Sequence, residues 1–296
     1  MPIKKLKMKI RTLIGYLGCV LLISSCVALN TDKTTMNIAF HPFIGYDTRA
    51  IESVPFPEDN SFRVWAKEGS AGPIYIQDEI VSYNDGWTTS YIWPEKELNF
   101  EAFWPEDLPI EYSVEKGIYI NDFDCTDGDI DILLAKGGSE EVADGVQPLN
   151  FDHLLSRMEF RMKHSLSDEM SVRVKKIELK GFGQKGDYNG EYSDGWLVEE
   201  FNATRVVFES EEGAEVLKGE ARYFGEEFYT IPQICIGSVE VSYEVRFSEA
   251  KWIPQSETIK KFEIAWEPSK HYTYTLNLCV DQLKYTPGIS SWSNRE

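Results

Sequence analysis

Apolar and polar residues alternate along much of this chain with a period of two, which is the period of a β-strand. From Val239 to Phe247 the apolar residues Val, Val, Tyr, Val and Phe are separated by Glu, Ser, Glu and Arg. Such alternation predicts a strand with one buried face and one face in contact with water. We expect further strands of this kind at residues 154–162, 262–266 and 272–280.

The first half of the chain repeats the pattern. We expect strands at residues 62–66, 73–81, 87–93, 98–104 and 130–135, and a strand-like stretch at 35–40. Between Val172 and Leu179 the apolar positions change parity across Lys175 and Lys176, which one extra residue in the strand explains. The sequence therefore predicts a β-bulge there. Only residues 156–163 have a spacing that a helix could share.

Residues 136–147 separate the two halves. This stretch holds three glycines, three acidic residues and few apolar ones, which is typical of a linker or a long loop. Strands of this length without intervening helices predict antiparallel β-sandwiches. We therefore expect an all-β protein with two tandem sandwich domains, residues 26–140 and 141–296. One large sandwich with a surface loop at this point is the alternative.

The N-terminus has the pattern of a signal peptide. Five cationic residues between Lys4 and Arg11 precede an uncharged, largely apolar run from Thr12 to Ser25, which is too short for a permanent membrane span. The motif Ile23-Ser24-Ser25-Cys26 resembles a bacterial lipobox, in which the cysteine receives acyl chains such as palmitate. We expect residues 1–25 to be removed, Cys26 to be lipidated, and the protein to reach the cell outer membrane. Plain cleavage beside an incidental cysteine is the alternative.

Charge and cysteine content restrict the partners and the covalent framework. Loss of residues 1–25 would remove five positive charges and no negative ones, changing the formal net charge from −19 to −24. So acidic a chain is not expected to bind nucleic acid, and its charge favours solubility. Cys125, Cys235 and Cys279 would remain, an odd number that excludes a complete disulfide framework. Whether Cys235 and Cys279 pair stays open.

Two stretches have the residue types of ligand sites. Gly181, Gly183 and Gly186 have the spacing of a dinucleotide motif, but the turn-rich sequence after them cannot open the helix that would hold a pyrophosphate. We expect a hairpin loop instead. Five aspartates lie between Asp122 and Asp131, yet the glycine of a calcium loop is out of register and no glutamate closes it. A solvated entry to a strand is the expected structure there.

The sequence gives no pattern of a catalytic or metal centre. The four histidines, His41, His153, His164 and His271, lack metal-ligand spacing. The chain has no Gly-x-Ser-x-Gly motif, and no local spacing singles out a catalytic pair of carboxylates. We expect neither an enzyme nor a cofactor.

Several motifs occur in the order found in a known family. Phe62–Ala66, Tyr91–Pro94, Leu98–Phe103 and Asp129–Ala135 resemble, in this order, the first domain of the fimbrillin family of the Bacteroides group. Pro148–Phe160, Ile231–Gln233, Tyr272–Leu276 and Ile289–Trp292 continue the resemblance into the second half. Each motif is mostly a strand pattern, but together they span nearly all of residues 60–292.

The resemblance implies two transthyretin-like β-sandwich domains, a lipidated precursor, and assembly into a fimbria by insertion of a strand from a neighbouring subunit. In the family an Arg-specific protease removes an N-terminal segment to open the groove for that strand. The matching position is Arg49, in a connection near Pro55 that suits proteolysis. The alternative is that Arg49 is an ordinary surface residue and the anchor stays attached. Because the chain ends shortly after Trp292, we expect a tip or accessory subunit that binds other fimbrial subunits and a host or bacterial surface ligand.

A permanently anchored glycan-binding lipoprotein is the rival function. Trp65, Trp87, Trp93 and Trp104 gather in the first half and could stack on sugar rings if they were exposed. Aromatic residues of sandwiches more often lie in the core, so the fimbrial subunit is the favoured interpretation.

Overall fold

A computed structural model describes residues 36–45, 54–138, 145–192 and 195–292. Within these ranges the chain forms strands and turns and no helix, which confirms the all-β prediction. Most strand pairs are antiparallel, but two are parallel: β1 with β10, and β11 with β20. Alternation of apolar residues shows which face of a strand is buried and not which strand lies beside it, so these two pairings could not be expected.

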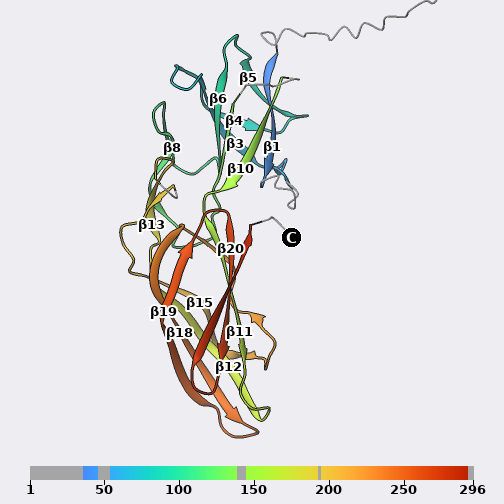
Figure 1. The fold of residues 1–296 in the computed structure, drawn as a ribbon. Coiled ribbons are helices and arrows are strands. Elements are labelled where there is room, and N and C mark those ends of the chain that lie inside the picture. Colours follow the sequence, from blue (N-terminus) through green and yellow to red (C-terminus); the bar gives the residue numbers. More distant parts are fainter. Residues whose placement is uncertain (1–35, 46–53, 139–144, 193–194, 293–296) are drawn as a thin grey trace, which may run out of the picture. The chain divides into compact units, whose positions relative to one another are not determined.

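The first sheet has eight strands (Figure 1). Its order is β2 (Val54–Pro55), β1 (Asn37–Ile44), β10 (Val146–His153), β9 (Leu133–Gly138), β6 (Leu98–Trp104), β3 (Ser61–Glu68) and β4 (Ile74–Ser82), and β5 (Trp87–Ile92) also pairs with β1. The strand expected at residues 130–135 is shifted towards the C-terminus, because β9 begins at Leu133 and ends at Gly138. The strand-like stretch at 35–40 is instead β1, which continues to Ile44.

Two further sheets form a sandwich from the second half of the chain. One contains β16 (Arg222–Tyr223), β11 (Ser156–His164), β20 (Lys270–Leu278) and β21 (Leu283–Ser291), with β17 (Phe228–Thr230) also paired to β11. The other contains β15 (Ala203–Val216), β12 (Met170–Phe182), β18 (Gln233–Phe247) and β19 (Ile253–Trp266). The predicted bulge in β12 is confirmed, because the pairing register shifts between Val174 and Lys176.

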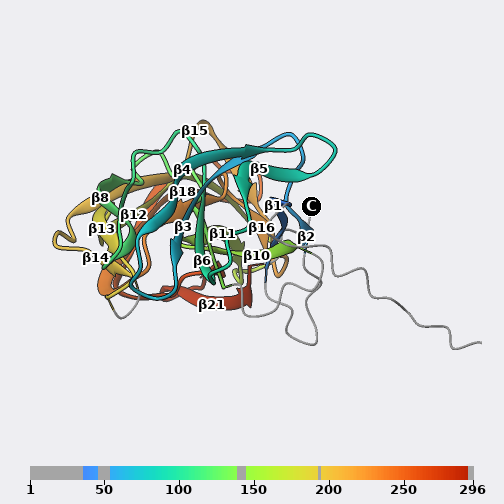
Figure 2. The same cartoon turned by 90° about the horizontal axis from the view of Figure 1, so that it is seen from above.

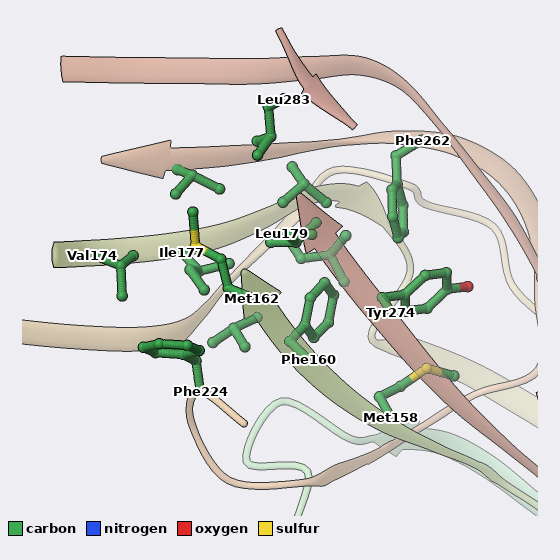
Figure 3. Close-up of a cluster of buried hydrophobic side chains, with 14 of the residues drawn as sticks. Met158, Phe160, Met162, Val174, Ile177, Leu179, Phe224, Phe262, Tyr274 and Leu283 are labelled. Atoms are coloured by element: carbon green, nitrogen blue, oxygen red, sulfur yellow. The ribbon is translucent and has the colours of Figure 1, made fainter. Parts of the chain in front are cut away.

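The core of this sandwich follows from the alternation in its strands. Met158, Phe160 and Met162 of β11 are buried, while the residues between them are only partly so. Figure 3 shows Phe160, Tyr274 and Phe262 close together, and the ring centroids of Phe262 and Tyr274 are 4.6 Å apart. Residues 156–163 are therefore strand and not helix, because their apolar side chains fill one side of a sheet.

A fourth sheet joins strands from both halves of the chain. Its order is β14 (Trp196–Leu197), β13 (Lys185–Asn189), β8 (Gly117–Asp124) and β7 (Glu111–Ser113). Its residues share one buried cluster with residues of β3, β6 and β9, including Trp65, Phe103, Ile120 and Tyr188. The division between residues 140 and 141 stays a prediction. It falls between β9 and β10, which pair, whereas a boundary after His153 would keep that sheet whole.

The end of β11 generates a prediction about pH. His164 is buried at 3 % exposure, and its Nδ1 accepts a hydrogen bond from the backbone N–H of Leu166 at 3.3 Å, so the ring is neutral. Burial, and next the charge of Lys218, lower the pKa of His164. The unfolded chain therefore binds a proton at this residue more readily than the folded chain does. Stability from this site is present above the ordinary histidine pKa of about 6.5 and is lost as the pH falls below it.

We expect the free energy of unfolding to drop between about pH 7 and pH 5, and the His164→Gln variant to lose part of that drop. Urea unfolding at each pH measures the effect. His41→Gln, at an exposed position of β1, is the matched control and should leave the slope unchanged. An identical slope in the wild type and in His164→Gln would contradict the assignment.

Candidate functional site

The candidate site is the strand β1 and the strands that border it. Its sequence places Ile38, Phe40, Pro42 and Ile44 on the buried face and leaves Asn37 and His41 exposed. Burial alternates through Ile44, but Pro42 and Phe43 break the apolar–polar alternation of the sequence, so the sequence indicated only the beginning of the strand. Its connection to the next strand is residues 46–53, which lie outside the described residues and contain Arg49.

The strand β1 has partners on both sides. It runs parallel to β10 over six residue pairs, from Ala39 opposite Val146 to Ile44 opposite Phe151. On its other side it pairs antiparallel with β5 and then with β2. The two views in Figure 1 and Figure 2 both place β1 beside β10. It is therefore an interior strand of the sheet, although it is the first strand that the structure describes.

Backbone hydrogen bonds tie the ends of β1 to these neighbours. The N–H of Trp93 donates to the carbonyl of Met36 at 3.0 Å, and the N–H of Phe56 donates to the carbonyl of Pro42 at 3.2 Å. On the β10 side the N–H of Gly45 donates to the carbonyl of Phe151 at 3.2 Å. Loss of β1 would leave donors and acceptors unpaired on two facing strands, which is the arrangement that accepts an added strand.

Aromatic side chains line the space that β1 fills. The ring of Phe40 meets the rings of Phe62 and Phe100 edge to face, with centroids 5.9 and 5.6 Å away. Phe62 also packs against Phe56 and Trp87, at 5.6 and 5.4 Å. Without β1 these rings would border an apolar groove. This groove and the unpaired backbone groups beside it could together bind a strand that has apolar residues at alternate positions.

The predicted site residues lie outside the described part of the chain. Cys26 and Arg49 both fall in such segments, so the structure bears on neither. In the described residues no helix is long and apolar enough to cross a membrane.

Two of the five aspartates of residues 122–131, Asp124 and Asp131, have separate side-chain partners. Asp124 accepts hydrogen bonds from the hydroxyl and the backbone N–H of Thr126, and it pairs with Lys185 at 2.9 Å. The hydroxyl bond of Thr126 foremost, and then Lys185, lowers the pKa of Asp124. Asp131 lies 2.8 Å from Nδ1 of His153. Among the described residues no group of three or more His, Cys, Asp or Glu side chains is placed to hold a metal ion.

The glycine-rich stretch joins two different sheets. β12 ends at Phe182, and β13 begins at Lys185 and pairs with β8 and β14. The turn-rich sequence after Gly186 forms the expected hairpin, because β13 pairs antiparallel with β14, whereas β13 does not fold back on β12. No helix follows Gly186, so the requirement of a dinucleotide motif is not met there.

The tryptophans of the first half of the chain are too buried to bind sugars by stacking. Trp65, Trp87 and Trp93 are buried, and Trp104 is half-buried against the core. A hollow of about 380 Å³ near β13 is lined by polar and acidic residues, including Asp122, Asp187 and Glu199, and by no aromatic ring. These four rings therefore offer no exposed face on which a sugar could stack.

The cysteines of the described chain are free. Cys125, Cys235 and Cys279 form no disulfide, so Cys235 and Cys279 do not pair. Burial raises the pKa of Cys235 to about 11 and also raises that of Cys125. Thiols with raised pKa values are poor nucleophiles at neutral pH.

Comparison with known proteins agrees with this fold. The model of the fimbrillin-like family matches residues 48–292. A solved fimbrial protein of Bacteroides vulgatus is similar with a TM-score of 0.64 and 13% identity, covering 86% of this chain and 99% of that one. Candidate cell adhesion proteins of Bacteroides uniformis (TM-score 0.55, 14% identity, 87% and 98% covered) and Bacteroides ovatus (0.53, 15%, 88% and 99%) are also similar. No curated protein matches the sequence.

The packing of β1 predicts unequal effects of neighbouring substitutions. Phe40→Ala removes a ring that is 4 % exposed and should lower the free energy of unfolding by about 3–5 kcal/mol. His41→Ala, at the next and exposed position, should change it by less than about 0.5 kcal/mol. Denaturant unfolding of the two variants measures the difference, and equal effects would contradict the described orientation of β1.

Proposed function

The chain belongs to the fimbrillin-like family, and from this premise we propose that it is a structural or adhesive subunit of a cell-surface fimbria. It is exported as a lipoprotein and assembles by donor-strand insertion after its N-terminal segment is removed. The observation that carries the proposal is the position of β1, an interior strand with partners on both sides and one connection to the rest of the sheet.

Proteolysis in residues 46–53 would separate β1 from the body without breaking any described strand. Arg49 is the arginine of that segment, and the next arginine, Arg63, lies within β3 and pairs with Asp78. Proteases act on accessible connections more readily than on paired strands. Arg49 is therefore the proposed processing site.

Removal of β1 would create the driving force for assembly. The buried side chains Ile38, Phe40 and Ile44 would leave, and the rings of Phe62 and Phe100 would become exposed to water. A strand from another subunit would cover this surface again and pair with β10 and β5. The partners of this protein are thus other fimbrial subunits, held by strand exchange.

Export and anchoring complete the proposal. Residues 1–25 act as a lipoprotein signal peptide, Cys26 receives the lipid, and the mature protein reaches the outer membrane and the cell surface. The body, residues 26–140 and 141–296, forms two transthyretin-like domains. The role is that of a structural or adhesive subunit and not of an enzyme. A permanently anchored glycan-binding protein is the alternative, and the burial of Trp65, Trp87 and Trp93 gives it little support.

Arg-specific proteolysis tests the processing step. Treatment of the purified precursor should give a single cut after Arg49, and the cleaved protein should then form mixed complexes with co-expressed fimbrillin subunits. Intact mass and native gels measure both steps. Arg49→Gln should remain uncut and unassembled, whereas Arg63→Gln should be cut as the wild type is. Assembly by the uncut Arg49→Gln variant would contradict the proposal.

Labelling with a palmitate analogue tests the anchor. The wild type should incorporate the label and sediment with membranes, because several acyl chains bind a bilayer firmly. Cys26→Ser should lose the label and most of the membrane-bound fraction. Cys19→Ser, within the signal peptide, is the matched control and should behave as the wild type does. Equal labelling of Cys26→Ser would show that another residue carries the lipid.

A further inference from the structure

Two amide side chains of β10 have oxygen atoms without a hydrogen-bond partner. Gln147 is 2 % exposed, and its Nε2 donates to the carbonyl of Pro148 at 2.9 Å, while its Oε1 finds no partner among the described residues. The Oδ1 atom of Asn150 is also buried and finds none there. Buried polar atoms of folded proteins nearly always have partners, so two such oxygens on one strand need an explanation.

The register of the sheet places both residues opposite phenylalanines of β1, and the amide of Gln147 lies close to Gly137 of β9. Gln147 lies opposite Phe40 and Asn150 lies opposite Phe43. Neighbouring strands are about 4.8 Å apart, so side chains at these paired positions are adjacent. Gln147 shares the buried face with Phe40, whereas Asn150 and the half-buried Phe43 lie on the other face. A phenylalanine ring offers no N–H or O–H to an amide oxygen.

The strand β1 is therefore well matched to the apolar part of the groove and poorly matched to these two oxygens. Ile38, Pro42 and Ile44 are buried as the alternation requires. An unpartnered buried oxygen weakens the folded state relative to one that accepts a hydrogen bond. A strand with donors at the two phenylalanine positions would keep the apolar contacts and also satisfy both amides.

We propose that Gln147 and Asn150 select the strand that replaces β1. That strand comes from another fimbrial subunit, runs in the direction of β1, and has apolar residues at the positions of Ile38, Pro42 and Ile44. At the positions of Phe40 and Phe43 it carries side chains with an O–H or N–H group, such as tyrosine inside and threonine outside. This inference rests on the proposed strand exchange. It explains why a covalently attached strand gives way to one from another chain.

The first experiment uses the intact chain and requires no strand exchange. Phe43→Thr, Asn150→Leu and the double variant form one double-mutant cycle, and Phe40→Tyr, Gln147→Leu and their double variant form another. Denaturant unfolding gives the coupling within each pair. We expect each hydroxyl to be favoured about fivefold, in the folding equilibrium constant, when its amide is present. Zero coupling in both cycles would overturn the inference. Asn150→Ala repeats the first cycle if Asn150→Leu does not fold.

The second experiment offers synthetic strands to the full chain after Arg-specific cleavage. Peptides of residues 37–45 are compared with the same peptides carrying Phe43→Thr or Phe40→Tyr, and native mass spectrometry measures their competition. Each substituted peptide should exceed the unchanged one by about fivefold. The preference for Phe43→Thr should vanish in Asn150→Leu, and that for Phe40→Tyr in Gln147→Leu.

The outcomes separate the two claims. If no peptide of any kind enters the cleaved protein, the proposed strand exchange is contradicted, and the cycles in the intact chain still decide the role of the amides. If peptides enter without preference, strand exchange stands and the selection by Gln147 and Asn150 is overturned.

Discussion

The structure of the first sheet depends on the interior position of β1. Its backbone is bonded on both sides, and its buried side chains complete a cluster of rings that includes Phe62 and Phe100. A strand at the edge of a sheet can be lost with little change to its neighbours, but an interior strand cannot. If β1 were removed as proposed, β10 would become an edge strand, β5 would lose its pairing with β1, and an apolar groove would open beside β10. In the proposed assembly, the groups that hold β1 in the folded chain would then bind a strand of another subunit.

The rest of the molecule holds this site in place from the far side of the sheet. Trp65 and Phe103, on β3 and β6, pack against Ile120 and Tyr188 of the sheet that joins both halves of the chain. Arg205 of β15 also donates to the carbonyls of Thr126 and Asp127 at 2.7 and 2.9 Å. The sheet that contains β1 thus has a second buried face at β3 and β6, which does not depend on β1. A body of this kind can retain its groove long enough for a partner strand to enter.

Much of the fold could be predicted from the sequence, for a clear physical reason. One-sided burial imposes alternation, so the strands around Val241, Phe160 and Phe262 and the bulge beside Lys175 were all visible in the chain. Which strands pair with each other could not be predicted from the sequence. The parallel contact of β1 with β10 brings together residues over a hundred positions apart, and alternation says nothing about such neighbours. The sheet formed by β8 and β13 was missed for the same reason, as was the end of the glycine-rich stretch in a different sheet.

The candidate site was only partly accessible to sequence analysis. Alternation identified the beginning of β1, and the family resemblance pointed to Arg49. Nothing in the sequence indicated that the amides of Gln147 and Asn150 lack partners, because the neighbours of a residue in a strand are not known from the sequence. A high-resolution structure of the assembled fimbria would show whether a strand of another subunit takes the place of β1, as we propose. We expect a strand of a different chain between β5 and β10. An assembled subunit that still holds its own residues 37–44 there would contradict it.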